Sequence, residues 1–304
     1  MPQSREIRKT ILLRQSSARV FAALVEATDL DAWWGEEPPS RTSQAPSNRA
    51  GWRSDGDSVI LVRSSRQNHQ LELSWRLNPD SPDPGEVAHT TVEFRLTPAS
   101  HDSHLESGEQ ATLLTVRQIG IPADPCWNVI FNTLNNRWVT HLVYLQYWVE
   151  SGRRRSDVDD PEHFATVSKS VTVPAPIDAV YEALVDPKLL ASWLDATVSF
   201  DARIGGKMSI LWAGGEHVGG EIVLLDQPRH AVWHWWDADK LETEDDPGMI
   251  TVMTWSLANI GEQTDLTLTD RGYDRALATD AYMLDIGKGW DTCLRAIPAV
   301  IGGS

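Results

Sequence analysis

The sequence has little cysteine, a shortage of positive charge and no long apolar run. Its two cysteines, Cys126 and Cys293, are too few for a disulfide framework and do not form a Cys-x-x-Cys motif, so we expect free, buried thiols in a reducing compartment. The charged N-terminal segment is followed by only three apolar residues, 11–13, whereas a signal peptide needs about 7–15 such residues and a membrane helix about 20. These absences predict a cytoplasmic protein without membrane insertion.

The shortage of basic residues excludes one class of partner. The chain has 27 Lys and Arg against 43 Asp and Glu, a net charge of −16. Binding to nucleic acid needs a basic patch that neutralises phosphates, and an anionic membrane surface attracts basic segments for the same reason. The acidic excess lies mainly in residues 168–304, which predicts at most a protein partner with a basic surface.

Established catalytic and cofactor motifs are also missing. There is no phosphate-binding glycine loop, no Gly-x-Ser-x-Gly and no His-Glu-x-x-His. His101 and His104 are separated by two residues in a polar stretch, a spacing that matches no established metal site. We therefore predict no catalytic residue, no metal and no cofactor.

What the chain does contain is an internal repeat. With a constant offset of 160 and no gap, residues 11–34 align with residues 171–194. A second match aligns residues 138–142 with residues 290–294. We infer two copies of one fold, residues 1–152 and 168–304, joined by a charged linker over residues 153–167. The best-matched pairs are Val20 with Val180, Ala23 with Ala183, Leu24 with Leu184, Val25 with Val185, Leu30 with Leu190 and Trp33 with Trp193.

Hydrophobic periodicity predicts an α+β architecture for each copy. In the second copy a strand over residues 166–173 precedes two short helices, and a long helix with one apolar stripe ends the chain. Between them, short apolar stretches separated by glycine and proline predict an antiparallel meander. A curved sheet of this kind must cover its inner face with the long C-terminal helix. The predicted meander strands are residues 198–200, 207–212, 217–225, 231–237, 249–257 and 264–269.

The second copy resembles a known family in the order of its segments. Residues 173–193, 203–209, 219–229, 266–272 and 289–290 are similar to the START-like (SRPBCC, helix-grip) superfamily, and within it to bacterial homologues of the activator of heat-shock-protein-90 ATPase. The resemblance implies two tandem helix-grip domains that hold hydrophobic or aromatic small molecules between helix and sheet. The first copy has residues 14–17 in place of the Pro-Ala-Pro turn at 174–176, so it is a divergent START-like domain.

Tryptophan is unusually frequent, with 14 residues against 5 Phe and 5 Tyr. An indole combines a large apolar surface with one N–H that needs a partner, which suits a pocket wall as well as an ordinary core. Strand alternation places Trp233 and Trp235 on one sheet face and His234 on the other, without indicating which face is inner. The predicted ligand-binding residues are Trp193, Trp212, Trp235, Trp255, Met283 and Trp290 in the second copy and Trp33, Trp75, Trp138 and His141 in the first.

These features support three hypotheses. The first is binding of a small hydrophobic or aromatic ligand without catalysis, because tryptophans accompany a helix-grip pattern that lacks a catalytic constellation. The second is a cyclase, dehydratase or hydrolase that uses His234 or a carboxyl group at the pocket mouth. The third is a stress- or chaperone-related protein-interaction module. For His141, a hydrogen-bonded core histidine is the alternative to a polar pocket group.

Overall fold

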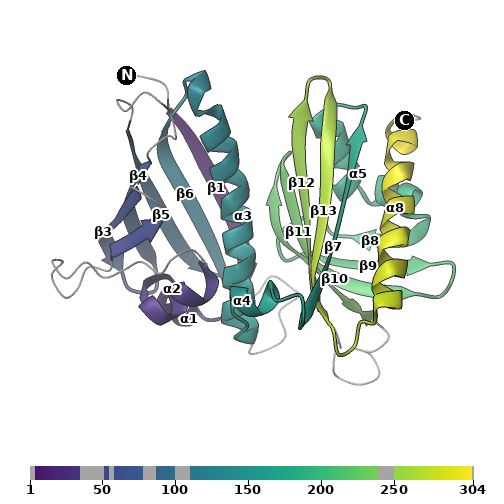
Figure 1. The fold of residues 1–304 in the computed structure, drawn as a ribbon, viewed down its shortest axis with the longest axis horizontal. Helices are drawn as coiled ribbons and strands as arrows, with labels where there is room; N and C mark the ends of the chain where they lie inside the picture. The colour runs from purple at the N-terminus through teal and green to yellow at the C-terminus, as the bar shows by residue number, and fades with distance from the viewer. Residues whose placement is uncertain are drawn as a thin grey trace. The chain divides into compact units, whose positions relative to one another are not determined.

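The computed structural model of the chain describes residues 4–34, 51–54, 58–77, 87–99, 110–238 and 250–302. They form two compact units, Met1–Ser156 and Asp157–Ser304 (Figure 1). Each unit is α+β and consists of an antiparallel sheet, two short helices after the first strand and a long C-terminal helix.

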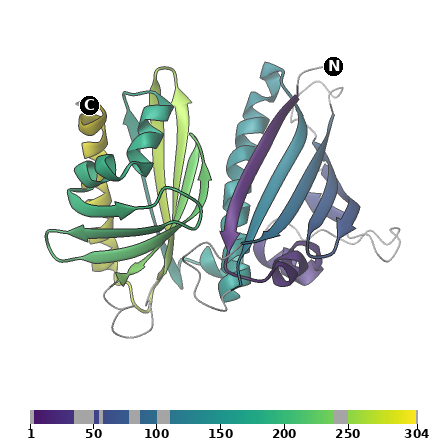
Figure 2. The same cartoon turned by 180° about the vertical axis from the view of Figure 1, so that it is seen from behind.

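The N-terminal unit has a sheet with strand order β2-β3-β4-β5-β6-β1, in which the described neighbours are antiparallel. Figure 1 shows α3 in front of β1 and β6, and Figure 2 shows the sheet in front of α3. The long helix therefore covers one face of this sheet. The elements are β1 (Ser4–Leu13), α1 (Ser17–Val25), α2 (Ala27–Trp33), β2 (Gly51–Ser54), β3 (Ser58–Arg66), β4 (Gln70–Leu77), β5 (Ala88–Pro98), β6 (Thr112–Pro122), η1 (Pro125–Trp127) and α3 (Asn128–Ser151).

The C-terminal unit has the strand order β8-β9-β10-β11-β12-β13-β7, again antiparallel. Its long helix packs against β7, α5 and α6. The elements are α4 (Arg155–Val158), which spans the boundary between the units, then β7 (Phe164–Val173), α5 (Ile177–Val185), α6 (Pro187–Leu194), β8 (Ala196–Phe200), β9 (Lys207–Trp212), β10 (His217–Asp226), β11 (His230–Asp237), β12 (Thr251–Ile260), β13 (Gln263–Asp274) and α8 (Asp280–Gly302).

Local sequence explains where the short helices begin. Asp186 caps α6, since its side chain accepts hydrogen bonds from the backbone N–H groups of Lys188 and Leu189, and Pro187 occupies the first helical position. At the start of α1 the Ser16 side chain accepts a hydrogen bond from the backbone N–H of Arg19. The Ser16 cap fixes the turn after β1, and the Asp186 cap fixes the turn between α5 and α6.

The two short-helix pairs hold their tryptophans in the same way. Trp33 Nε1 donates to the Ala23 carbonyl at 2.8 Å, and Trp193 Nε1 donates to the Ala183 carbonyl at 2.7 Å. These two pairs stand at the offset of 160 that aligns the repeat. Both rings are buried, so each indole has its polar group satisfied inside its unit.

The structure differs from the sequence prediction in the linker. Residues 153–167 include α4 and the first four residues of β7. Phe164 and Ala165 continue the ladder with Asp274 and Tyr273, since a register shift in β13 extends that pairing. Charge alone predicted a linker here, but Ala165 is buried in the core.

One cysteine prediction is wrong. Cys126 is exposed in η1, directly before α3, whereas Cys293 is half-buried on α8. None of the helices within the described ranges is long and apolar enough to cross a membrane.

Candidate functional site

Six tryptophans of the C-terminal unit pack ring against ring between the sheet and the helices. Neighbouring ring centroids lie 5.4–6.0 Å apart, in edge-to-face or tilted arrangements. The rings come from α6, β9, β11, β12 and α8, so the cluster connects elements distant in sequence. We call this set the aromatic cluster: Trp193, Trp212, Trp233, Trp235, Trp255 and Trp290.

All five tryptophans that the sequence predicted in this unit belong to the cluster, and Trp233 joins them. Strand β11 directs Trp233 and Trp235 to the inner face, since Trp233 contacts Trp255 and Trp235 contacts Trp290 of α8. By the same alternation His234 lies on the opposite face. The hypothesis that His234 acts on a ligand held by the tryptophans is therefore wrong.

The indole N–H groups of the cluster are not equally satisfied. Trp212 Nε1 donates to the Leu194 carbonyl at 3.1 Å, and Trp193 is bound as described above. The Nε1 atoms of Trp233 and Trp255 are buried and have no hydrogen-bond partner among the described residues. A buried donor left unpaired costs about 1–3 kcal/mol, so these two groups favour an acceptor that the packing of this unit does not supply.

Exposure varies along the cluster. Trp193, Trp233 and Trp255 are buried, whereas Trp212 and Trp235 are half-buried. The predicted residue Met283 on α8 is also half-buried and packs against the same core. On the first turns of α8, Tyr282 is 44% exposed and Leu284 60% exposed. Within the cluster, solvent therefore reaches Trp212 and Trp235.

A buried carboxyl group, which sequence reasoning missed, lies on the inner face of β13. Asp270 is fully buried, and its Oδ2 accepts a hydrogen bond from the Tyr273 hydroxyl at 2.5 Å. Its Oδ1 has no partner among the described residues. Burial raises the pKa of Asp270, interactions with the Tyr273 and Thr251 hydroxyls partly oppose this rise, and the net value is about 6.

A β-bulge brings Tyr273 to Asp270. The register of β13 against β7 shifts between Arg271 and Tyr273, and the intervening Gly272 has a φ of +97°. Without the extra residue, alternation would direct Tyr273 to the outer face. The predicted strand ended at residue 269 and did not include Asp270, so the burial of this residue was not foreseen.

In the N-terminal unit the predicted residues also come together. Trp75 and Trp138 lie edge to face at 5.9 Å, and Trp34, which was not predicted, contacts Trp33 at 5.3 Å and Trp138 at 5.7 Å. His141 stacks on Trp34 with ring centroids 4.0 Å apart. The predicted aromatic residues of this unit therefore form one packed group.

His141 is buried, as a core histidine would be, but its Nδ1 has no hydrogen-bond partner among the described residues. Burial, together with the charges of Arg155 and Arg137, lowers the pKa of His141 to about 3. The imidazole is therefore neutral in the folded protein at ordinary pH.

Gln118 in β6 stands where Asp270 stands in β13. Each lies two residues before a bulged glycine of positive φ, Gly120 at +95° in β6, and each strand pairs with the first strand of its unit. Gln118 is fully satisfied, because its amide donates to Thr90 Oγ1 at 3.1 Å and accepts from Trp138 Nε1 at 2.8 Å. The N-terminal unit thus has a neutral, hydrogen-bonded group at the position where the C-terminal unit has an acid.

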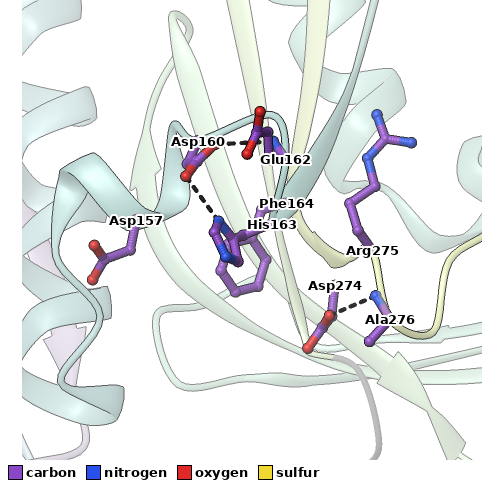
Figure 3. Close-up of a pocket in the computed structure, with 8 residues that line it drawn as sticks. All are labelled: Asp157, Asp160, Glu162, His163, Phe164, Asp274, Arg275 and Ala276. Atoms are coloured by element: carbon purple, nitrogen blue, oxygen red, sulfur yellow. Dashed lines mark hydrogen bonds and ion pairs between the residues drawn. The ribbon is translucent and has the colours of Figure 1, made fainter.

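A cavity of about 550 Å³ lies elsewhere in the C-terminal unit, at the start of β7 and the end of β13 (Figure 3). Asp160 accepts hydrogen bonds from the ring of the exposed His163 at 2.8 Å and from the backbone N–H of Glu162. The hydrogen bond to Asp160 raises the pKa of His163. These contacts stabilise turns, and the cavity contains none of the predicted site residues. Its lining is Asp157, Asp160, Glu162, His163, Phe164, Asp274, Arg275 and Ala276.

No group of His, Cys, Asp or Glu side chains within the described ranges is arranged to hold a metal ion. His101 and His104 lie outside those ranges.

Comparison with known proteins finds one family that the C-terminal unit resembles. Residues 174–302 match the family model described as activator of Hsp90 ATPase homolog 1-like protein. No curated protein matches the chain significantly.

Solved structures include similar chains, all of low sequence identity. Protein MLL2253 from Mesorhizobium loti is 20% identical, with 46% of this chain and 98% of that chain covered and a TM-score of 0.41. PFC0360w, an HSP90 activator from Plasmodium falciparum, is 23% identical over 45% of this chain and 96% of that chain, with a TM-score of 0.37. DynU16, from the dynemicin biosynthetic locus, is 15% identical over 97% of both chains, with a TM-score of 0.35.

Proposed function

We propose that the C-terminal unit, whose residues 174–302 match the Aha1-like family model, binds a small hydrophobic or aromatic molecule between its sheet and α8, without transforming it. The aromatic cluster is the wall of this site. The cluster offers flat apolar surfaces from five elements, which suits a flat apolar ligand better than a long flexible one.

The observation that carries this proposal is the pair of unpartnered indole N–H groups on Trp233 and Trp255. Buried indole N–H groups usually find a partner inside the protein, as Trp193 does with Ala183. A ligand with a carbonyl or ether oxygen would supply the missing acceptor. A buried water is the rival explanation, because water satisfies such groups in many proteins.

Access to the site follows from the pattern of exposure. Trp212, Trp235 and Met283 are half-buried, and the first turns of α8 carry exposed apolar side chains. A ligand therefore enters by parting α8 from β9 and β11, where few buried contacts have to be broken. The fully buried Trp193 and Trp255 form the floor.

We infer that residues 1–152 are a divergent domain of the same type. The matching indole-to-carbonyl hydrogen bonds of Trp33 and Trp193 support this inference. Trp75 Nε1 in this unit is also buried without a partner among the described residues, but Trp75 and the rings packed against it, Trp34 and Trp138, are all buried, so no half-buried ring marks an entry and we assign them no ligand.

The test uses N-phenyl-1-naphthylamine, a neutral apolar probe whose fluorescence increases out of water and which accepts energy from excited tryptophan. The full chain is titrated with the probe, with excitation of tryptophan. We expect saturable binding with energy transfer. A control with the probe and the urea-unfolded chain should show none.

Two matched variants locate the site. Trp235→Ala removes a half-buried indole next to Trp290, and Trp75→Ala removes the indole at the corresponding β4 position. Both tryptophans lie directly across from a threonine of the next strand, Thr251 or Thr90. We expect Trp235→Ala to weaken binding at least tenfold and Trp75→Ala to leave it unchanged. Absence of saturable binding, or loss only in Trp75→Ala, would contradict the proposal.

A further inference from the structure

We propose that Asp270 is the polar end of this site and binds the protonated amine of an otherwise apolar ligand. The inference rests on the proposed function and narrows it to one ligand class, apolar or aromatic amines.

The first argument is geometric. Asp270 lies opposite Met253 in the ladder of β12 and β13, and the neighbouring inner-face residue of β12, Thr251, lies opposite Trp235. The carboxyl group therefore lies on the same face of the sheet as Trp235, with strand β12 between them. One of its oxygens is bound by Tyr273, and the other, Oδ1, is buried without a partner among the described residues.

The second argument concerns charge. The side chains that face Asp270 are Tyr273 on its own strand, Thr251 on β12, Val167 on β7 and Tyr282 on α8, which contacts Tyr273 at 6.3 Å. All of them are uncharged at neutral pH, because the pKa values of both tyrosines are raised, mainly by burial.

The nearest cation on β7 has a different partner. Lys169 donates to Asp291 of α8 at 2.6 Å, and strand alternation directs Arg271 to the outer face. A buried carboxylate without a positive partner is costly, and an ammonium group on a ligand would remove that cost. The open face of Trp235 adds a cation–π contact for the same group.

The third argument is the comparison with Gln118. In the N-terminal unit the position is occupied by the neutral Gln118, whose amide donates one hydrogen bond and accepts another. In the C-terminal unit the same position is occupied by Asp270, one of whose carboxylate oxygens has no partner among the described residues. If the position served only packing, an amide would serve in both units. The acid therefore points to recognition of a positive charge.

The experiment compares two probes of almost the same shape, 2-(1-naphthyl)ethylamine and 2-(1-naphthyl)ethanol, by quenching of tryptophan fluorescence in the full chain. At about pH 8 we expect the amine to bind at least tenfold more tightly than the alcohol. Because Asp270 ionises near pH 6, the affinity for the amine should increase about tenfold from pH 5 to pH 8, while that for the alcohol stays constant. This pH profile needs no variant.

Two variants separate the role of Asp270 from general effects of acidity. Asp270→Asn keeps the shape and removes the charge, so it should abolish the preference for the amine and leave the affinity for the alcohol within about twofold. Asp265→Asn removes a carboxylate from the outer face of the same strand, where it binds the Thr172 hydroxyl, and should leave the preference intact. Asp270→Glu, which keeps the charge, should retain part of the preference for the amine.

The outcomes distinguish the two proposals. Equal affinity of the wild-type chain for both probes, or an amine preference that survives in Asp270→Asn, would overturn the role of Asp270 while leaving the aromatic site in place. Binding of neither probe would contradict the proposed function itself.

Discussion

Replacement of Asp270 by asparagine should make the C-terminal unit more stable at high pH, although it removes a hydrogen-bonded side chain. Burial raises the pKa of Asp270 from 3.8 to about 6 in the folded protein. A shift of about two pKa units corresponds to about 3 kcal/mol by which ionisation of this group opposes folding at neutral and higher pH. Asparagine cannot ionise, and its carbonyl oxygen can still accept the hydrogen bond from Tyr273.

The direction of the pH dependence follows from linkage. A carboxyl group with a raised folded-state pKa stabilises the protein fully below the unfolded-state value near pH 4, and this contribution is lost as pH rises through about 6. The stability of Asp270→Asn relative to wild type should therefore grow by about 2 kcal/mol between about pH 4.5 and about pH 8.

The assay is urea unfolding of the full chain at both pH values, followed by tryptophan fluorescence. The N-terminal unit is identical in both proteins, so the difference between them reports on the C-terminal unit. Asp265→Asn is the control, and its stability relative to wild type should not follow the same trend. A difference between Asp270→Asn and wild type that is constant with pH, or that shrinks as pH rises, would refute the reasoning.

Two further predictions concern other positions. Because burial holds the pKa of His141 at about 3, its neutral form favours folding above the unfolded-state value near 6.5, and this stability is lost as pH falls toward 3. The variant His141→Leu should therefore show a weaker loss of stability at acid pH in urea unfolding. NMR of the wild-type imidazole should show no titration above about pH 5. Gly272→Ala places a Cβ at a φ of +97° and should destabilise the chain by about 1–2 kcal/mol in the same assay. Gly289→Ala is the control, because a Cβ at this position inside α8 would meet nothing, and it should be neutral or stabilising.

The repeat and the strand alternation were sufficient to predict much of the fold. The offset of 160 paired Trp33 with Trp193, and the structure gives each the same hydrogen bond to a helix carbonyl. Alternation in β11 placed Trp233 and Trp235 on one face, as observed. Side-chain period depends only on local backbone geometry, so these features could be predicted without knowledge of the fold.

The polar end of the site could not be predicted in this way. The alternation of side chains along a strand is interrupted at a β-bulge, and the bulge at Gly272 brings Tyr273 and Asp270 together. A glycine shortly after a strand usually signals a turn, so its role in continuing β13 depends on pairing with β7, about a hundred residues earlier. The short helix α4 and the first two residues of β7, inside the predicted linker, were missed for a related reason, since composition does not report long-range pairing.

The central claim is that the C-terminal unit holds a small molecule between its sheet and α8. The most direct test is native mass spectrometry of the freshly purified full chain, compared with the mass of the denatured chain. We predict extra mass in the folded protein that is released on denaturation, and that fragments as an apolar or aromatic amine. If the folded mass equals that of the bare chain, and the chain also fails to take up N-phenyl-1-naphthylamine, the tryptophans serve only as packing and the claim is contradicted.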